Sequence, residues 1–108
     1  MTKKISIQRG SGNVFADLKL SDADETMAKA ELAGRVHKII KQRRLTQTSA
    51  GKLLGINQPK VSALLNGRLD GFSTERLFRF LNALGCDVRI TVSHPHPKAS
   101  GRVRVLTG

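Results

Sequence analysis

The sequence predicts a mostly α-helical bundle of four to five helices with a short β-strand on either side. Apolar residues recur at intervals of three and four through most of residues 22–84, which is the pattern of helices with one buried face. Glycines and capping residues divide this region into separate helices. Residues 3–8 and 87–93 instead alternate polar and apolar side chains, as short strands do.

A chain of 108 residues is expected to form one domain with a small core. We expect the helices to make up that domain. A strand and linker should come before it, and a strand and basic tail should follow. The expected segments are residues 1–20, 21–85 and 86–108.

Positive charge is concentrated in the later part of the chain. Residues 1–34 contain five basic and five acidic side chains, whereas residues 35–108 contain fourteen basic and three acidic ones. The net charge of +11 therefore belongs entirely to the second segment. Such a surface favours a polyanion as partner, because each phosphate that it neutralises releases a condensed counterion.

Several classes of protein are disfavoured. No run of 18 apolar residues is present, so we expect no membrane span and no membrane partner, and the N-terminus lacks the apolar stretch of a signal peptide. The single cysteine, Cys86, cannot form an internal disulfide, which favours a reducing cytoplasm. Cys86, His94 and His96 do not have the spacing of a zinc site, and no catalytic motif occurs. We therefore expect no metal, no cofactor and no enzymatic activity.

Residues 22–43 are expected to form the longest helix. Asp22 and Glu25 stand three apart, as in a capping box, and suit the positive end of the helix dipole. The residues expected on its buried face are Met27, Leu32, Val36, Ile39 and Ile40. His37 lies beside that face and is expected at the surface.

Two shorter helices are predicted within residues 45–67. Thr46 can cap the first, because its hydroxyl accepts a hydrogen bond from the free N–H groups of the opening turn. The residues expected to face inward are Ala50, Leu53 and Leu54. Gly55 follows at the point where a helix ends through a left-handed residue, a conformation that glycine adopts without steric cost.

Asn57 can cap the second helix, and Pro59 in its first turn removes no helical hydrogen bond. The expected buried residues are Val61, Leu64 and Leu65, and Gly67 ends the helix. Two helices joined by a three-residue turn that contains glycine form a helix-turn-helix.

The residues of this motif resemble those of Xre/Cro-like phage-repressor regulators. The shared pattern comprises Thr46-Gln47, Ala50, Leu54-Gly55-Ile56, Gln58-Pro59-Lys60-Val61-Ser62, Leu64 and Gly67. The wider frame is similar to that of HigA-type antitoxins over residues 11–18, Gly71-Phe72-Ser73 and Glu75-Arg76-Leu77. The resemblance implies a lambda-repressor-like helical bundle that binds double-stranded DNA.

In such proteins the second helix of the motif enters the major groove. Carried onto matching positions, the resemblance implies base contacts by Gln58, Pro59, Lys60 and Ala63. It implies phosphate contacts by Gln47 and Asn66, to which Lys52, Ser62 and Arg68 are added as further candidates. The Gln58 amide can bond adenine bidentately, Lys60 can reach guanine O6 and N7, and Ala63 can touch a thymine methyl.

Two positions depart from the family pattern. Many relatives have glutamate three residues after the capping threonine, whereas this chain has Ser49. We therefore expect a weaker helix start without the reciprocal bond of a capping box. Pro59 stands where many relatives place a polar side chain for base contact.

Ser73 is expected to cap a last helix over residues 74–84. Its expected buried face is Leu77, Phe80, Leu81 and Leu84, and Gly85 ends it. Phe78 lies roughly 60° from that face, so we expect it at the edge of the core or on a partner surface. Val14, Phe15 and Leu18 fit one helical turn near the N-terminus. From His94 onward we expect a mobile tail, in which Val103 and Val105 fit a further short strand.

A lone strand cannot satisfy its own backbone, so the strand at residues 87–93 needs a partner. The candidates are the N-terminal strand and the same strand of a second subunit, and either pairing favours a homodimer. The residues expected at this interface are Ile5, Ile7, Val88, Ile90 and Val92.

Two roles fit these features. The first is a dimeric repressor that binds a palindromic operator sequence-specifically. The second is an antitoxin that binds a toxin protein and represses its own operon. Non-specific nucleic-acid binding is disfavoured by the polar residues expected in the groove, and RNA binding by the presence of only four aromatic residues, all phenylalanine.

Overall fold

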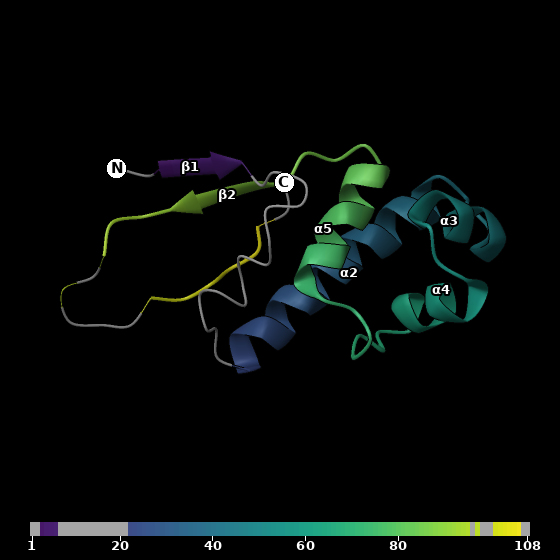
Figure 1. Ribbon diagram of the computed structural model, residues 1–108, viewed down its shortest axis with the longest axis horizontal. Helices are drawn as coiled ribbons and strands as arrows, with labels where there is room; N and C mark the ends of the chain where they lie inside the picture. The colour runs from purple at the N-terminus through teal and green to yellow at the C-terminus, as the bar shows by residue number, and fades with distance from the viewer. Residues whose placement is uncertain (1–2, 7–21, 96, 98–100, 107–108) are drawn as a thin grey trace.

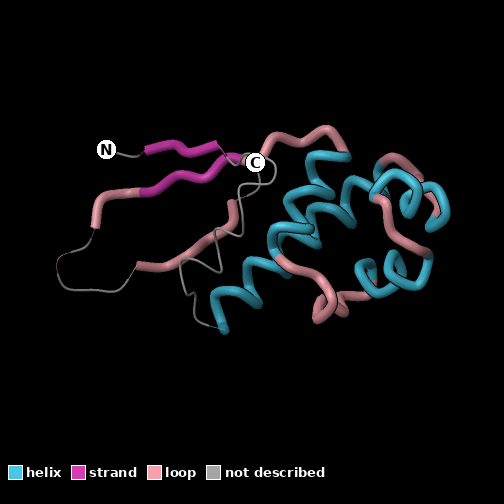
Figure 2. Tube along the Cα trace, in the orientation of Figure 1, coloured by secondary structure: helices cyan, strands magenta, loops and turns pink. Residues whose placement is uncertain are grey.

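The computed structural model describes residues 3–6, 22–95, 97 and 101–106. Within these ranges, four helices form a bundle and two strands form a sheet at the far end of the molecule, which confirms the predicted fold class (Figures 1 and 2). The elements are β1 (Lys3–Ser6), α2 (Asp22–Gln42), α3 (Gln47–Leu54), α4 (Gln58–Leu65), α5 (Thr74–Ala83) and β2 (Arg89–Val92). Ile7 and the helical turn expected around Val14, Phe15 and Leu18 lie outside the described residues.

The core lies where α2 packs against α5, with the two short helices closing its other side. Its members from α2 and α5 include Leu32, Val36, Ile39, Ile40, Leu77, Phe80 and Leu81, and those from α3 and α4 are Ala50, Leu54, Val61 and Leu64. Full burial of one large apolar side chain stabilises the fold by about 1.5–3 kcal/mol. This shared core therefore holds the short helices against the long one.

The prediction that Met27 faces the core is wrong, because its side chain is 61% exposed. Ala28 occupies the buried position instead and precedes Leu32 and Val36 at four-residue intervals. Met27 precedes Leu32 by five residues, so its side chain points about 140° away from that of Leu32 around the helix axis. His37 is exposed, as predicted.

Phe78 was expected at the core edge or on a partner surface, but it is only 6% exposed. Leu77 and Phe78 are both buried although they are neighbours in sequence. This is because α5 packs against α2 on one side and approaches α3 on another, so more than one face of the helix is covered.

Each described helix ends in the same way. A residue with a left-handed backbone follows the last turn, and the next N–H bonds back to the carbonyl five residues earlier. The left-handed residues are Arg44 (φ 54°), Gly55 (φ 73°), Gly67 (φ 74°) and Gly85 (φ 88°). The bonds run from Leu45 to Ile40, Ile56 to Gly51, Arg68 to Ala63 and Cys86 to Leu81, at 2.9–3.1 Å. The three glycines confirm the predicted helix ends, and Arg44 is the one member of the set that pays a steric cost for its conformation.

β1 pairs with β2 in an antiparallel sheet, so the N-terminal strand is the partner of the C-terminal one within the chain. Lys3 lies opposite Val92, and Ile5 lies opposite Ile90. β2 is shorter than the predicted residues 87–93, and β1 begins at Lys3 as predicted, with residues 7 and 8 outside the described ranges.

Residues 101–106 contact the bundle and form no strand, which corrects the expectation of a further short strand at Val103 and Val105. The Val103 N–H donates to Asp24 Oδ2 at 3.4 Å, and the Arg102 guanidinium lies 3.6 Å from Asp24 Oδ1. Val105 packs against the core. The Asp24 carboxylate in the first turn of α2 thus anchors the segment.

Gly51 is the point of closest approach between α3 and the turn that follows it. A Cβ atom at this position would stand 2.7 Å from the Ile56 carbonyl oxygen and 3.4 Å from a Val61 methyl group. The first distance is well inside van der Waals contact, and its partner is backbone that cannot rotate away. Only glycine therefore allows α3 and α4 to pack at this separation.

We expect Gly51→Ala to destabilise the protein by about 1–3 kcal/mol, because the added methyl group overpacks this contact. Gly34→Ala is the matched control, since Gly34 lies in a helix with no atom within 4 Å of the added Cβ. It should stabilise by about 0.5–1 kcal/mol through helix propensity alone. Urea unfolding of both variants measures the difference. An unchanged midpoint for Gly51→Ala would show that the turn relaxes without cost.

We also expect Arg44→Gly to stabilise the protein by about 0.5–1 kcal/mol, because it relieves a side chain in the left-handed region. Gly67→Ala should do the reverse. Gly67 has the same backbone conformation and no atom within 4 Å of an added Cβ, so backbone strain alone is tested there. Thermal unfolding of the pair measures both effects, and a lower melting temperature for Arg44→Gly would contradict the assignment of strain.

Candidate nucleic-acid interface

α3 begins with a complete capping box, so the predicted weakness at Ser49 is wrong. Thr46 Oγ1 accepts the Ser49 backbone N–H at 3.0 Å, and Ser49 Oγ accepts the Thr46 N–H at 3.3 Å. The two hydroxyl oxygens lie 2.6 Å apart and share a further hydrogen bond. This bond draws the short serine side chain back over the helix end, where it replaces the longer glutamate of many relatives.

α4 begins as predicted. Asn57 Oδ1 accepts the Lys60 backbone N–H at 2.9 Å, and Pro59 lies in the first turn. Gly55 provides the left-handed residue that lets the chain turn between the helices. The first turns of both short helices are therefore fixed by side-chain caps, and the residues that follow each cap are held in a defined direction.

Leu53 does not face inward as predicted, since its side chain is 43% exposed. The buried residues of α3 are Ala50, Gly51 and Leu54. Because Gly51 packs directly against the turn, the buried face of α3 is centred on the Gly51 side and Leu53 falls outside it.

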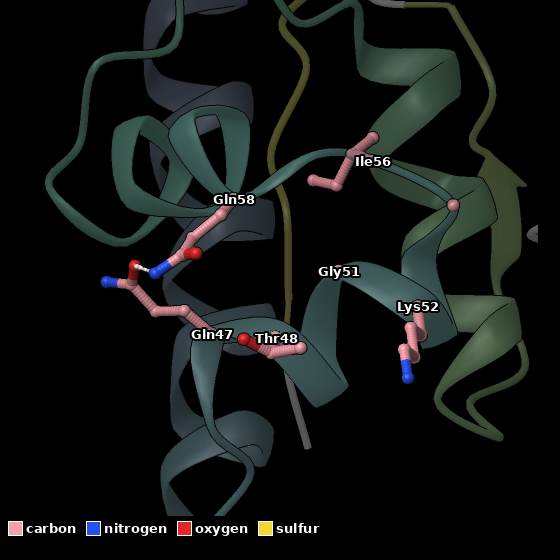
Figure 3. Close-up of a pocket in the computed structure, with 7 residues that line it drawn as sticks. Gln47, Thr48, Gly51, Lys52, Ile56 and Gln58 are labelled. Carbon is pink, nitrogen blue, oxygen red and sulfur yellow. Dashed lines mark hydrogen bonds between the residues drawn. The ribbon is translucent and has the colours of Figure 1, made fainter.

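Gln47 and Gln58 contact each other where the first turns of α3 and α4 meet. Each is the first residue of its helix, and Gln58 Nε2 donates to Gln47 Oε1 at 3.5 Å (Figure 3). Both line an open depression of about 430 Å³ between the two helices. The other residues around it are Thr48, Gly51, Lys52, Gly55 and Ile56. The depression is therefore bordered by two amides and one ammonium group.

The outer face of α4 carries most of the predicted base-contacting residues. Gln58, Pro59 and Lys60 are exposed, whereas Ala63 is partly buried against the core. Val61 and Leu64 form the opposite, buried face. The structure thus brings Gln58 and Pro59 fully to the surface and leaves Ala63 at its margin.

The predicted phosphate-contacting residues surround this face. Lys52 in α3 and Arg68 in the loop after α4 are both exposed. Ser62 lies in α4, and Asn66 caps the C-terminal end of that helix one turn later and contacts Ser62. Asn66 Nδ2 donates to the Ser62 carbonyl oxygen at 2.8 Å and to Ser62 Oγ at 3.3 Å. Asn66 therefore also closes the C-terminal end of the recognition helix.

Phe72 and Arg76 lie next to this surface, and neither is among the predicted site residues. The Lys60 ammonium lies 5.7 Å from the centre of the Phe72 ring, and the Arg76 guanidinium lies 5.6 Å from it. Lys60 and Phe72 are twelve positions apart in different elements, so no local spacing predicts their contact. Both residues around the ring are cations, and they extend the basic surface toward α5.

Of the residues predicted at a dimer interface, Ile5, Ile90 and Val92 lie in the sheet. Ile5 pairs with Ile90 in the ladder, while Val92 is 50% exposed. Val88 precedes β2 and packs against the core of its own chain, so it is less available than predicted. Val92 and Ile90 are the residues of β2 that remain as candidates.

No group of three or more histidine, cysteine, aspartate or glutamate side chains that could hold a metal ion occurs in the described ranges. None of the helices in that part of the chain combines the length and apolar composition that crossing a bilayer requires.

Residues 14–93 match a protein family described as a helix-turn-helix domain. This match includes all four described helices and β2. A solved structure named "Putative XRE Family Transcriptional Regulator" is 47% identical to this chain. The similarity covers 82% of this chain and 100% of that one, with a TM-score of 0.74. None of the curated proteins matches the chain.

Proposed function

The chain belongs to this helix-turn-helix family of DNA-binding transcription regulators, and on that premise we propose that it represses transcription as a homodimer on a palindromic operator. Repression requires the protein to prefer one DNA sequence over others, so the proposal depends on groups that read bases. α4 supplies such groups at its first turn.

The observation that carries the proposal is the contact between the Gln47 and Gln58 amides. This bond uses one N–H of Gln58 and leaves its carbonyl oxygen and second N–H, which is the pair that bonds adenine N6 and N7. It also leaves the Gln47 amide group available to donate to a phosphate oxygen. Gln47 would thus hold the reading side chain in register with the DNA backbone.

The other polar residues around α4 are proposed to position the protein on the DNA. Lys52, in α3, and Arg68, in the loop after α4, are exposed cations before and after the recognition helix in the chain, and both suit phosphate oxygens. Asn66 donates both amide hydrogens to Ser62, the Ser62 Oγ bond being the longer at 3.3 Å, so a phosphate contact would replace that longer bond. Pro59 and Ala63 present apolar surface between these contacts, which suits a thymine methyl group.

A homodimer is proposed through the sheet. A two-stranded sheet is marginally stable alone, and its outer edges present backbone groups that a second copy can pair with. Val92 supports this proposal because it is an apolar residue of β2 that remains 50% exposed, and a second copy could cover it. Two-fold symmetry would present two recognition helices to the two halves of a palindrome.

An antitoxin role is the second candidate. α2 carries an outward-facing strip of Met27, Ala30 and Gly34 that the described residues leave uncovered. Such a strip can accept an apolar partner segment beside a separate DNA-binding surface. A neighbouring gene for a small RelE-like endoribonuclease, and co-purification of its product with this protein, would favour this role. Loss of co-purification in Met27→Lys would locate the contact on α2.

Gln58→Ala should relax base preference at one operator position and cost about 1–3 kcal/mol of discrimination, because a bidentate contact is lost. Gln42→Ala, an exposed glutamine at the end of α2, is the matched control and should bind as the wild type does. Binding to a library of operator variants measures the preference. Unchanged preference in Gln58→Ala would contradict this orientation of α4.

The operator itself can be found by pulling down fragmented genomic DNA with the purified protein at physiological salt. We expect enrichment of a palindrome upstream of the gene for this protein. Flat enrichment despite tight binding would contradict sequence-specific repression and would show that the basic charge acts alone.

Val92→Glu should weaken the dimer, because a charge replaces the exposed apolar group on the edge of the sheet. Lys3 lies opposite Val92, so the carboxylate introduces no like-charge pair within the chain. Leu106→Glu is the control, since Leu106 is 92% exposed outside the sheet. Sedimentation equilibrium measures the dissociation constant. An unaltered dimer in Val92→Glu would place the interface elsewhere.

A further inference from the structure

We propose that Lys60 and Arg76, which share the Phe72 ring, form a binding site for one backbone phosphate of the bound DNA. The inference rests on the proposed function and assigns to it a contact from α5, outside the helix-turn-helix. It also gives Lys60 a different role from the guanine contact that the resemblance implies.

The site is built around a buried aromatic ring. Phe72 is 3% exposed and lies edge-to-face with Phe80, with ring centres 5.9 Å apart and planes at 74°. The Arg76 guanidinium lies 5.6 Å from the Phe72 ring centre and 5.7 Å from that of Phe80. Both rings therefore restrict the position of the Arg76 guanidinium. The Lys60 ammonium is held by the Phe72 ring alone, 5.7 Å from its centre.

Two cations thus lie within 6 Å of one ring centre, and neither forms an ion pair with any described residue. The nearby Glu75 carboxylate bonds instead to Arg79 at 3.0 Å. These distances place the two cations at most about 11 Å apart, and an anion between them is attracted by both. A phosphate oxygen is the anion that a DNA-binding surface meets, and guanidinium groups match its geometry well.

The position of Lys60 on α4 agrees with this role. At 100° per residue, the buried Val61 and Leu64 define the inner face of α4, and Pro59 lies almost opposite to them. Lys60 lies about 100° from Pro59, toward the loop that carries Phe72. Its ammonium is therefore directed to the flank of the recognition helix, where the DNA backbone runs, and away from the centre of the groove.

The dependence of DNA affinity on salt tests the proposal. Each neutralised phosphate contributes about 0.9 to the slope of log affinity against log salt concentration. We expect the double variant Lys60→Gln, Arg76→Gln to lower that slope by about 0.9 and to weaken operator and random DNA alike, by roughly fivefold at 0.15 M salt. Each single variant should lower the slope by less, because the other cation still holds the phosphate.

Arg79→Gln is the control for net charge, since Arg79 lies in the same helix and pairs with Glu75. It should leave the slope unchanged. Arg76→Lys tests whether the charge or only the stacking matters, and it should keep the slope while losing some thermal stability. All variants are compared below their measured melting temperatures, so a loss of folding is seen separately.

Three outcomes would overturn the proposal. An unchanged slope in the double variant would mean that the cations only cover the core, and a fall of about 1.8 would mean two separate phosphates. A change of base preference in Lys60→Gln alone would show that Lys60 contacts a base in the major groove and not a phosphate. The proposed function would survive each of these outcomes, because it is tested by wild-type binding to an operator and by Gln58→Ala.

Discussion

The close contact between Gly51 and the Ile56 carbonyl oxygen sets the geometry of the whole recognition surface. It determines how near α4 can lie to α3, and hence whether Gln47 and Gln58 can touch. The same region packs Ala50 and Val61 into the core that α2 and α5 share. A change at one small residue therefore alters both the stability of the bundle and the relative placement of the side chains that meet DNA.

The features predicted correctly from sequence are those decided within a few residues. Thr46, Asn57 and Ser73 cap their helices as expected, because a side chain bonding to an N–H three residues later needs no distant partner. Gly55 ends its helix for a similarly local reason. The resemblance assigned Gln47 and Gln58 separate contacts with DNA, and their contact with each other was not predicted, since it depends on the angle between two helices.

The predictions of burial that were wrong concern residues whose exposure depends on tertiary contacts. Leu53 and Met27 belong to apolar patterns, but each lies on a side of its helix that the described part of the chain leaves exposed. Phe78 is more deeply buried than predicted, because α5 is covered on more than one face. The cations over Phe72 could not be foreseen, because a ring contact between α4 and a residue twelve positions later leaves no periodic signal.

The molecule is elongated, with extents of 48 × 25 × 24 Å, and Figure 1 shows the sheet and the recognition helix at opposite ends of the long axis. In two copies joined at the sheet, the recognition helices would lie at the two ends far from the dimer contact. Half-sites one helical turn of DNA apart, about 34 Å, require a small angle between the long axes of the subunits, whereas a wide angle requires a longer spacer. The distance between the halves of the operator would therefore report the angle at which the subunits join.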